Sequence, residues 1–201
     1  MQKTLFYIYD PMCSWCWAFR PVWQEIVQRL QPVVAPKRLL GGLAIDSDEP
    51  MPMAMQLYLQ KTWRTIQQQL PETEFNFNFW SLCQPRRSTW PACRAVIAAR
   101  EQGAVYEGDM IEAIQQAYYL RALNPSDRDI LITLAQEVGL DITVFAQQLD
   151  SDTTRKQLEQ EMAQGLAMGV RSFPSLVLQD GAGYRQIEHH YLNVPQILNQ
   201  L

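Results

Sequence analysis

Two cysteines near the start of the chain have types and spacing that predict chemistry. Cys13 and Cys16 lie three positions apart in the run DPMCSWCW. A thiolate attacks a disulfide sulfur, and a second thiol held nearby resolves the mixed disulfide that forms. The spacing therefore predicts a redox-active pair, with Cys13 as the nucleophile and Cys16 as the resolving thiol.

The residues after Cys13 predict a helix that would support this role. From about residue 14 to residue 30, apolar side chains recur at helical spacing, and the pattern ends before Pro32. The N–H groups of a first helical turn, together with the helix dipole, stabilise a thiolate. We therefore expect Cys13 to be the exposed attacking thiol and Cys16, one turn later, to lie deeper.

Two other interpretations of the pair are a zinc site and structurally inert cysteines. A structural zinc site needs four ligands. The remaining cysteines, Cys83 and Cys93, are not at metal-ligand spacing, and His189 and His190 are adjacent to each other. We therefore predict no metal site. Cys83 and Cys93 are interpreted as inert thiols, with a second redox pair as the alternative.

The composition is that of an ordinary folded protein. Of the 201 residues 47% are hydrophobic, and the net charge is −4 with no basic run, which argues against a nucleic-acid partner. No apolar stretch reaches the ~20 residues of a membrane span, so no membrane partner is expected. Only about six apolar-leaning residues precede Asp10, too few for a signal peptide, and the chain is expected to be cytoplasmic.

The elements that would position the cysteines lie at both ends of the chain. An apolar strand over 5–9 leads directly to Cys13, and the helix that follows is succeeded by a second strand within 33–43. Near the C-terminus, strands over 175–179 and 184–188 flank the turn DGAG, and a short helix over about 194–201 ends the chain. The order is β-α-β, a long middle segment, then β-β-α.

The middle segment reads as a helical block. Residues 52–168 are rich in Gln, Ala, Leu and Met, and their helical periodicity is interrupted by Pro or Gly. The expected helices cover 53–70, 89–100, 105–123, 126–138, 142–149 and 153–168. Residues 72–84 (ETEFNFNFWSLCQ) lack helical period and are expected to form a loop over a cleft.

Two motifs give the chain a family resemblance. DPMCSWCWAF near the start and GVRSFPSLVL near the end, together with STWPACRAVIAAR in the middle, resemble the DsbA family of thioredoxin-fold oxidoreductases. Within that family, the chain is most similar to the cytosolic FrnE-type branch of predicted protein-disulfide isomerases. The resemblance spans the whole chain.

The resemblance implies an α/β thioredoxin fold interrupted by a large all-helical insertion. Residues 1–45 and 169–201 would form the thioredoxin-like domain, and residues 46–168 the inserted helical domain. It also implies that Phe173-Pro174 is a cis bond facing the cysteine pair. Pro174 would then belong to the catalytic site, and the backbone of Phe173 would offer strand-like hydrogen bonds to an extended substrate.

The residues around the cysteines refine this expectation. Ser14, Trp15, Trp17 and Phe173 are expected to bind substrate through a surface near the sulfur, although Trp17 also fits a core position. Ser14-Trp15 contains no His, unlike the periplasmic oxidant of the family, which favours a milder redox poise. Asp10 is interpreted as a turn residue before Pro11, with a buried proton acceptor for Cys16 as the alternative.

The sequence therefore predicts a thiol–disulfide oxidoreductase or protein-disulfide isomerase. It would act on protein or peptide thiols and disulfides without a prosthetic group, and glutathione or another redox protein would regenerate it. One alternative is a glutathione-dependent isomerase or transferase of a small aromatic substrate, although related isomerases of this kind have Ser at the first cysteine position. The other is a non-catalytic, chaperone-like module that binds peptides.

Overall fold

The fold is built on a four-stranded mixed sheet with the order β2-β1-β3-β4. In the computed structural model, which describes residues 3–201, the strands are β1 (Lys3–Tyr9), β2 (Val34–Leu40), β3 (Ser175–Asp180) and β4 (Gly183–Ile187). β1 runs parallel to β2 and antiparallel to β3, which is antiparallel to β4. The predicted α/β thioredoxin fold is confirmed. The expectation of a cytoplasmic protein was drawn from the residues before Asp10. Two of these, Met1 and Gln2, lie outside the residues that the structure describes.

β1 is buried on both faces, which explains why its sequence is a continuous apolar run rather than an alternating one. Because successive strand side chains point to opposite faces, Tyr7 and Tyr9 share one side with Leu5, and Phe6 shares the other with Ile8. The first face belongs to the main hydrophobic core, and the second packs with Val170 and Val177 in a smaller cluster.

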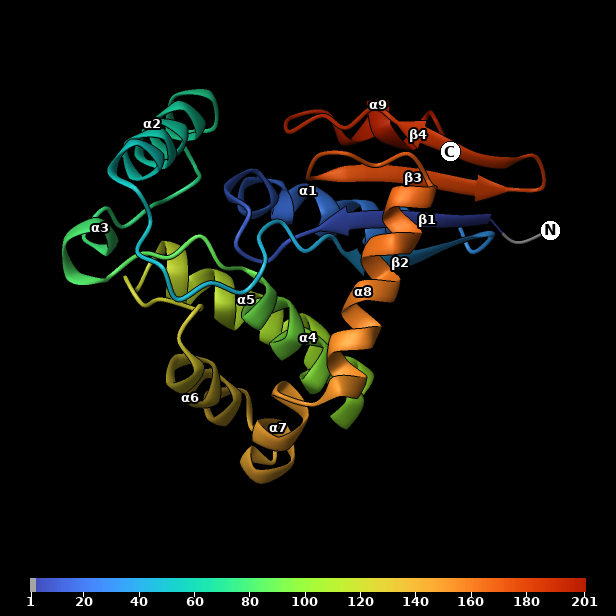
Figure 1. Ribbon diagram of the computed structural model, residues 1–201. Helices are drawn as coiled ribbons and strands as arrows, with labels where there is room; N and C mark the ends of the chain where they lie inside the picture. Colours follow the sequence, from blue (N-terminus) through green and yellow to red (C-terminus); the bar gives the residue numbers. More distant parts are fainter. Residues whose placement is uncertain (1–2) are drawn as a thin grey trace.

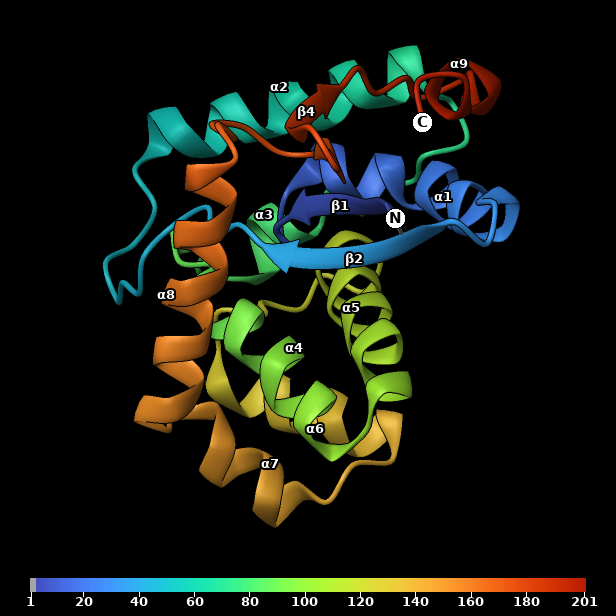
Figure 2. The same cartoon turned by 90° about the vertical axis from the view of Figure 1, so that its right-hand side faces the viewer.

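Helices surround the sheet and form a separate layer below it (Figures 1 and 2). α1 (Ser14–Arg29) connects β1 to β2. Between β2 and β3 the chain forms α2 (Met53–Gln69), α3 (Phe79–Leu82), α4 (Trp90–Gln102), α5 (Ala104–Tyr119), α6 (Arg128–Val138), α7 (Ile142–Leu149) and α8 (Asp152–Ala167), and α9 (Val194–Leu198) follows β4. None of these helices is both long enough and apolar enough to cross a membrane, as far as residues 3–201 are concerned.

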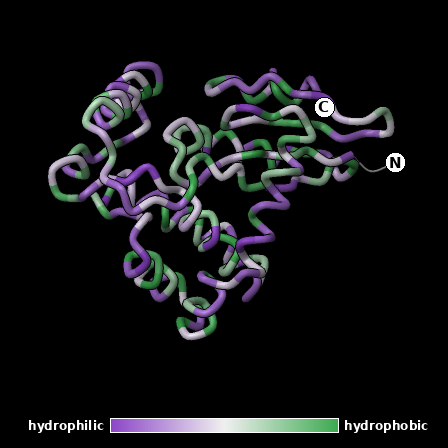
Figure 3. The backbone as a smooth tube through the Cα atoms, in the orientation of Figure 1, coloured by the Kyte–Doolittle hydropathy of each residue, from purple (hydrophilic) through white to green (hydrophobic). Residues whose placement is uncertain are grey.

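α8 returns the chain from the helical layer to the sheet (Figure 1). It is among the more hydrophilic segments, and the apolar residues concentrate on the central strands instead (Figure 3). Near its C-terminal end, α8 packs on the sheet at Gly165, where a Cβ would be in ordinary van der Waals contact with Ile8 of β1 at 3.4 Å. This packing places the loop before β3 beside the end of β1.

Residues 72–84 differ from the expected loop over a cleft. They contain the short helix α3, and their aromatic side chains pack around the fully buried Trp63 of α2. Phe75 stacks on Trp63 with ring centroids 4.9 Å apart, and Trp80 lies at the same centroid distance. The alternation of aromatic and polar residues, which gave no helical signal, is the pattern of a segment that anchors one end of α2.

The main core runs through both the strands and the inserted helices. It includes Tyr7 and Cys16 beside β1 as well as Ile97 of α4 and Ile114 of α5. The two parts are therefore packed together rather than joined by a linker. The division at residues 46–168 stays a prediction.

Candidate active site around Cys13 and Cys16

The strand register brings the two distant motifs together. Ile8 of β1 lies opposite Ser175 of β3, so the residues after Tyr9 and those before Ser175 meet at the same end of the sheet. Phe173-Pro174 precedes β3 directly and is a cis bond, as the resemblance implied. Cys13 and Phe173, 160 positions apart in the chain, are thereby in contact.

Cys13 occupies the N-cap position of α1. Its Sγ accepts a hydrogen bond from the backbone N–H of Cys16 at 3.4 Å. Its thiol also donates to the carbonyl oxygen of Phe173 at 3.6 Å. Cys13 is 7% exposed, less open than expected for the attacking thiol, whereas Cys16 is 0% exposed. The order of depth between the two sulfurs is as predicted, and both are free thiols in this structure.

Cys16 is enclosed on the core side of Cys13. Burial raises the pKa of its thiol well above the ordinary value, and the neighbouring Cys13 raises it further. Behind it lies Tyr7 of β1, whose own pKa is raised by burial, by the two cysteines and by a hydrogen bond with Cys16. Cys16 therefore holds its proton firmly in the reduced protein.

The dipeptide between the cysteines contacts two different elements. Ser14 accepts a 2.9 Å hydrogen bond from the indole nitrogen of Trp63, which links the active-site turn to α2. Trp15 is half-buried and packs against Tyr191, with ring centroids 5.3 Å apart. Both residues line the cleft next to Cys13, where the substrate-binding expectation needs them to be.

Trp17 does not belong to that surface. It is 6% exposed, stacks on Tyr119 at a centroid distance of 5.5 Å and donates from its indole nitrogen to the carbonyl of Glu74. Trp17 thus occupies the core position considered as the alternative, and its part in substrate binding stays a prediction. Two positions in an α-helix differ by ~200°, so Trp17 points to the opposite side of α1 from Trp15.

Asp10 takes the predicted turn role and is also buried, whereas its role as a proton acceptor for Cys16 stays a prediction. Its Oδ1 accepts from the N–H of Met12 at 2.8 Å, which is the predicted turn contact. The residue is also fully buried, and its Oδ2 accepts from the N–H of Leu43, the hydroxyl of Thr89 and the thiol of Cys93. Burial raises the pKa of this carboxyl, while these hydrogen bonds oppose the rise.

A cleft of about 290 Å³ opens beside Cys13. Apolar and aromatic side chains from four parts of the chain form much of its lining: Met12, Trp15, Leu43, Met51, Tyr58, Leu59, Tyr118 and Phe173. Two cations, Arg87 and Arg171, also line it, and no Asp or Glu does. Among the described residues, neither guanidinium has an ion-pair partner, so the cleft carries positive charge in a protein of net charge −4.

Several of these lining residues were not singled out from the sequence. Met51 lies just before α2, Tyr58 belongs to α2, and Arg87 lies just before α4. All three are within the predicted insertion. Only Arg171 carried a local signal, because it stands two positions before Phe173 in the C-terminal motif. The others are brought to Cys13 by the packing of the insertion, which has no short-range signature.

The other candidate ligands do not gather into a site. Within residues 3–201, no group of three His, Cys, Asp or Glu side chains is arranged to hold a metal ion. His189 packs edge-on against Phe19, and burial lowers its pKa. Cys83 donates to the carbonyl of Ala122, whereas Cys93 donates to Asp10. Whether these two thiols are redox-inert stays a prediction.

Comparison with known proteins agrees with the fold described above. The thioredoxin family model matches residues 6–193. The chain belongs to the thioredoxin family. Among solved structures, it is similar to a Nitrosomonas europaea protein reported as a "putative protein disulfide isomerase", with 25% identity, a TM-score of 0.82, and coverage of 99% of this chain and 95% of the other.

Further similarities support the DsbA type of fold within the thioredoxin family. The cytosolic disulfide reductase DsbM from Pseudomonas aeruginosa, also solved with glutathione, has a TM-score of 0.74, 22% identity and coverage of 92% and 89%. A curated relative named ClpXP adapter protein SpxH, from Halalkalibacterium halodurans, is 28% identical over 84% of this chain. This chain spans 56% of that relative, about half its length.

Proposed function

We propose that this thioredoxin-family protein is a thiol–disulfide oxidoreductase that exchanges disulfides through Cys13 and Cys16. The observation that supports this most directly is the position of Cys13. Its sulfur lies at the N-terminus of α1, beside the Phe173 carbonyl and at the edge of a cleft, with Cys16 immediately behind it. This arrangement places the sulfur of Cys13 where a substrate can reach it and keeps the sulfur of Cys16 buried for the resolving step.

The proposed cycle has two exchange steps. The Cys13 thiolate attacks a substrate disulfide, so that one substrate sulfur joins Cys13 and the other leaves as a thiolate. Cys16 then loses its proton and attacks the Cys13 sulfur, and the second substrate sulfur leaves with the electrons of the broken bond. Run in reverse, the same steps oxidise a substrate dithiol and allow isomerisation. No prosthetic group is needed.

The cleft indicates how an extended substrate would bind. The carbonyl of Phe173 next to Cys13 can accept a backbone N–H from a substrate strand. Trp15 and Tyr58 offer apolar contact, and Ser14 also lines the cleft. Pro174 fixes the backbone beside Phe173. These are the substrate-binding roles that we assign to residues 14, 15, 173 and 174.

The partners follow from the same chemistry. Protein or peptide disulfides are the proposed substrates, and glutathione or another redox protein would regenerate the pair, in line with the glutathione-containing structure of DsbM. Ser14-Trp15, without a His, favours a milder poise than that of a strong oxidant. We place the protein in the cytoplasm, where such a reductase or isomerase would encounter glutathione.

A comparison of three variants tests the proposal. Insulin reduction is measured with the parent protein, Cys16→Ser and a Cys13→Ser/Cys16→Ser double variant, with the thermal midpoint of each confirming the fold. We expect both variants to lose turnover, and Cys16→Ser to accumulate a mixed disulfide at Cys13 that mass spectrometry detects. Full turnover by the double variant would contradict the proposal.

The same variants separate the two alternative functions. A glutathione-dependent isomerisation of a small aromatic molecule would survive Cys16→Ser, because no resolving thiol takes part in it. A chaperone-like module would bind unfolded peptide equally well after both cysteines are replaced. If the parent protein does not reduce insulin and one of these two results is found, the corresponding alternative replaces the proposed function.

A further inference from the structure

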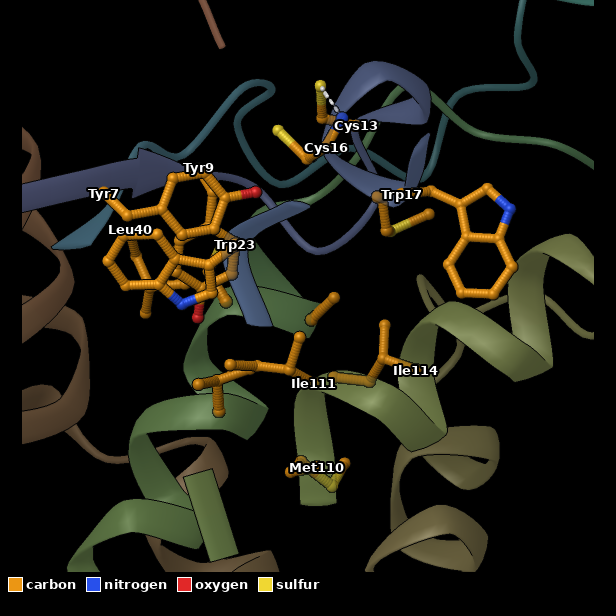
Figure 4. Close-up of a cluster of buried hydrophobic side chains, with 14 of the residues drawn as sticks. Tyr7, Tyr9, Cys13, Cys16, Trp17, Trp23, Leu40, Met110, Ile111 and Ile114 are labelled. Atoms are coloured by element: carbon orange, nitrogen blue, oxygen red, sulfur yellow. Dashed lines mark hydrogen bonds between the residues drawn. The ribbon is translucent and has the colours of Figure 1, made fainter. Parts of the chain in front are cut away.

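A second cavity, of about 220 Å³, lies behind Cys16. It shares no lining residue with the cleft beside Cys13. Its walls come from β1, α1, β2 and α5, so it lies at the contact between the sheet and the inserted helices. Figure 4 shows Tyr7, Tyr9 and Trp23 on one side of this contact and Ile111 of α5 on the other. We call this cavity the rear chamber.

The rear chamber is lined by polar atoms that have no hydrogen-bond partner within residues 3–201. They are the hydroxyl of Tyr9, the indole nitrogen of Trp23, Nε of Arg20 and Oε1 of Gln115. Tyr9, Trp23 and Gln115 are each at most 3% exposed. A buried polar atom without a hydrogen bond costs ~1–3 kcal/mol, so native proteins satisfy such atoms with ordered water.

The size of the chamber suits water better than a large ligand. At roughly 30 Å³ per molecule, its volume holds on the order of seven waters. Cofactor and drug-sized ligands occupy pockets of about 300 Å³ or more. Both hydrogen-bond donors and acceptors line the chamber, and the cation of Arg20 is neutralised by Glu112 at 2.8 Å. This mixed, balanced lining fits water rather than an anion.

Cys16 requires a proton route that the front of the site does not provide. Its thiol must lose a proton when it resolves a mixed disulfide and regain one when the pair is reduced, yet it is fully buried. The nearby carboxylate of Asp10 already accepts four hydrogen bonds, from Met12, Leu43, Thr89 and Cys93. The rear chamber, in contrast, touches Cys16 and also reaches the half-buried Gly108.

We propose that the rear chamber is a hydrated channel that transfers the proton of Cys16 to and from solvent, with Tyr7 positioned beside the sulfur. This inference rests on the proposed function and names the route that its second step uses. In that step the Cys16 S–H bond breaks and the proton leaves through the chamber. The sulfur bonds to Cys13, and the substrate sulfur departs as a thiolate. In the reverse direction the proton returns by the same path.

Gly108 offers a way to plug the chamber with little disturbance of the fold. A Cβ at this position would meet no heavy atom within 4 Å. In addition, glycine inside a helix makes that helix less stable than most other residues do. Gly108→Leu would therefore fill the mouth while stabilising α5. Val105→Leu is the matched control, because Val105 is on the same helix, 70% exposed and outside the chamber. Gly108→Ala provides an intermediate size.

The first measurement is a single turnover with 5,5′-dithiobis(2-nitrobenzoate) in a Cys83→Ser background. Attack by Cys13 releases one coloured thiolate in a phase that depends on reagent concentration, and resolution by Cys16 releases the second in a phase that does not. We expect Gly108→Leu to slow the second phase by about tenfold and to leave the first unchanged, because positioned proton transfer is worth ~10²–10⁴-fold. Val105→Leu should match the parent in both phases.

The outcomes distinguish the inference from the proposed function. Absence of the first phase in the parent contradicts the function itself, whereas a second phase that is equally fast in Gly108→Leu and the parent overturns only the chamber. A second measurement needs no turnover: in a Cys13→Ser variant, infrared spectroscopy follows the exchange of the Cys16 S–H proton with D₂O, which should be slower after Gly108→Leu is added. Equal exchange rates with and without Gly108→Leu would likewise overturn the inference.

Discussion

The carboxylate of Asp10 accepts a hydrogen bond from the hydroxyl of Thr89, and the two oxygens are 2.6 Å apart. Asp10 precedes the redox motif, and Thr89 is the N-cap residue of α4. The same hydroxyl oxygen accepts from the N–H of Ala44 at 3.0 Å. This one side chain thus joins the active-site loop, the segment after β2 and the inserted helices.

Replacing Thr89 with Val tests the importance of that junction. The change leaves a buried carboxylate and a part-buried N–H with one hydrogen bond fewer each, so we expect the free energy of unfolding to fall by ~1–3 kcal/mol. Urea denaturation of the reduced protein measures it. Thr133→Val is the control, because the exposed Thr133 donates only within its own helix. Equal effects of the two substitutions would contradict the assigned role.

The raised pKa of Asp10 predicts how stability depends on pH. Because the native carboxyl titrates above its ordinary value of 3.8, the folded state binds this proton more tightly than the unfolded state. Stability from Asp10 is therefore greatest below that value and declines as pH rises through the native pKa. Relative to Asp10→Asn, the free energy of unfolding of the parent should fall with pH across this window. Urea titrations at stepped pH measure the difference, and a rising difference would refute the prediction.

Arg87 and Arg171 of the cleft, which have no ion-pair partner in the part of the chain that the structure describes, predict a preference for negatively charged substrates. We expect Arg87→Gln/Arg171→Gln to lower kcat/KM for oxidised glutathione about fivefold, since one exposed charge pair is worth ~1 kcal/mol. The uncharged hydroxyethyl disulfide should react equally well with both proteins. Raising the salt concentration should shrink the difference, because salt screens exposed charges. An equal loss for both disulfides would argue against charge recognition.

Gly41 predicts a constraint on the ring of Phe173. A Cβ on Gly41 would lie 2.2 Å from two ring carbons of Phe173, so the ring must move if Gly41 becomes Ala. We expect Gly41→Ala to lower kcat/KM for a peptide disulfide by about tenfold, because small misplacements at a reacting centre are costly. Reduction of the pair by dithiothreitol needs no backbone partner and serves as the control. If Gly41→Ala has the same kcat/KM for the peptide disulfide as the parent, the ring of Phe173 can move without affecting the reaction, and the prediction is wrong.

The features that could be predicted from the sequence are those with a short-range signal. The strand before Cys13 is an uninterrupted apolar run, and the helices of the block keep a regular period over many residues. The cysteine spacing alone indicates a redox pair but leaves a zinc site and inert thiols open, and the redox activity stays a proposal. The cis bond at Phe173-Pro174, in contrast, was expected only from family resemblance, since nothing local distinguishes Pro174 from a proline at the start of a strand.

The features that escaped prediction depend on contacts between distant segments. Trp17 was expected near the reactive sulfur or in the core, and only the packing of α5 against α1 shows that it stacks on Tyr119. The partners of Asp10 lie in residues 43, 89 and 93, which no motif connects to it. Likewise, Tyr9 looked like an ordinary strand residue, and its unpartnered hydroxyl becomes evident only once α5 packs nearby.

The contact between Cys13 and Phe173 spans 160 positions, and this has a consequence for the newborn protein. Synthesis proceeds at ~5–20 residues per second, so roughly 8–32 seconds separate the appearance of these two residues. Through that interval the cysteine pair is translated but has neither β3 beside it nor the Phe173 carbonyl against its sulfur. The thiols are then open to oxidation and to unintended partners. Until residue 173 has been added, the two thiols therefore lack the protection that this contact gives them in the folded chain.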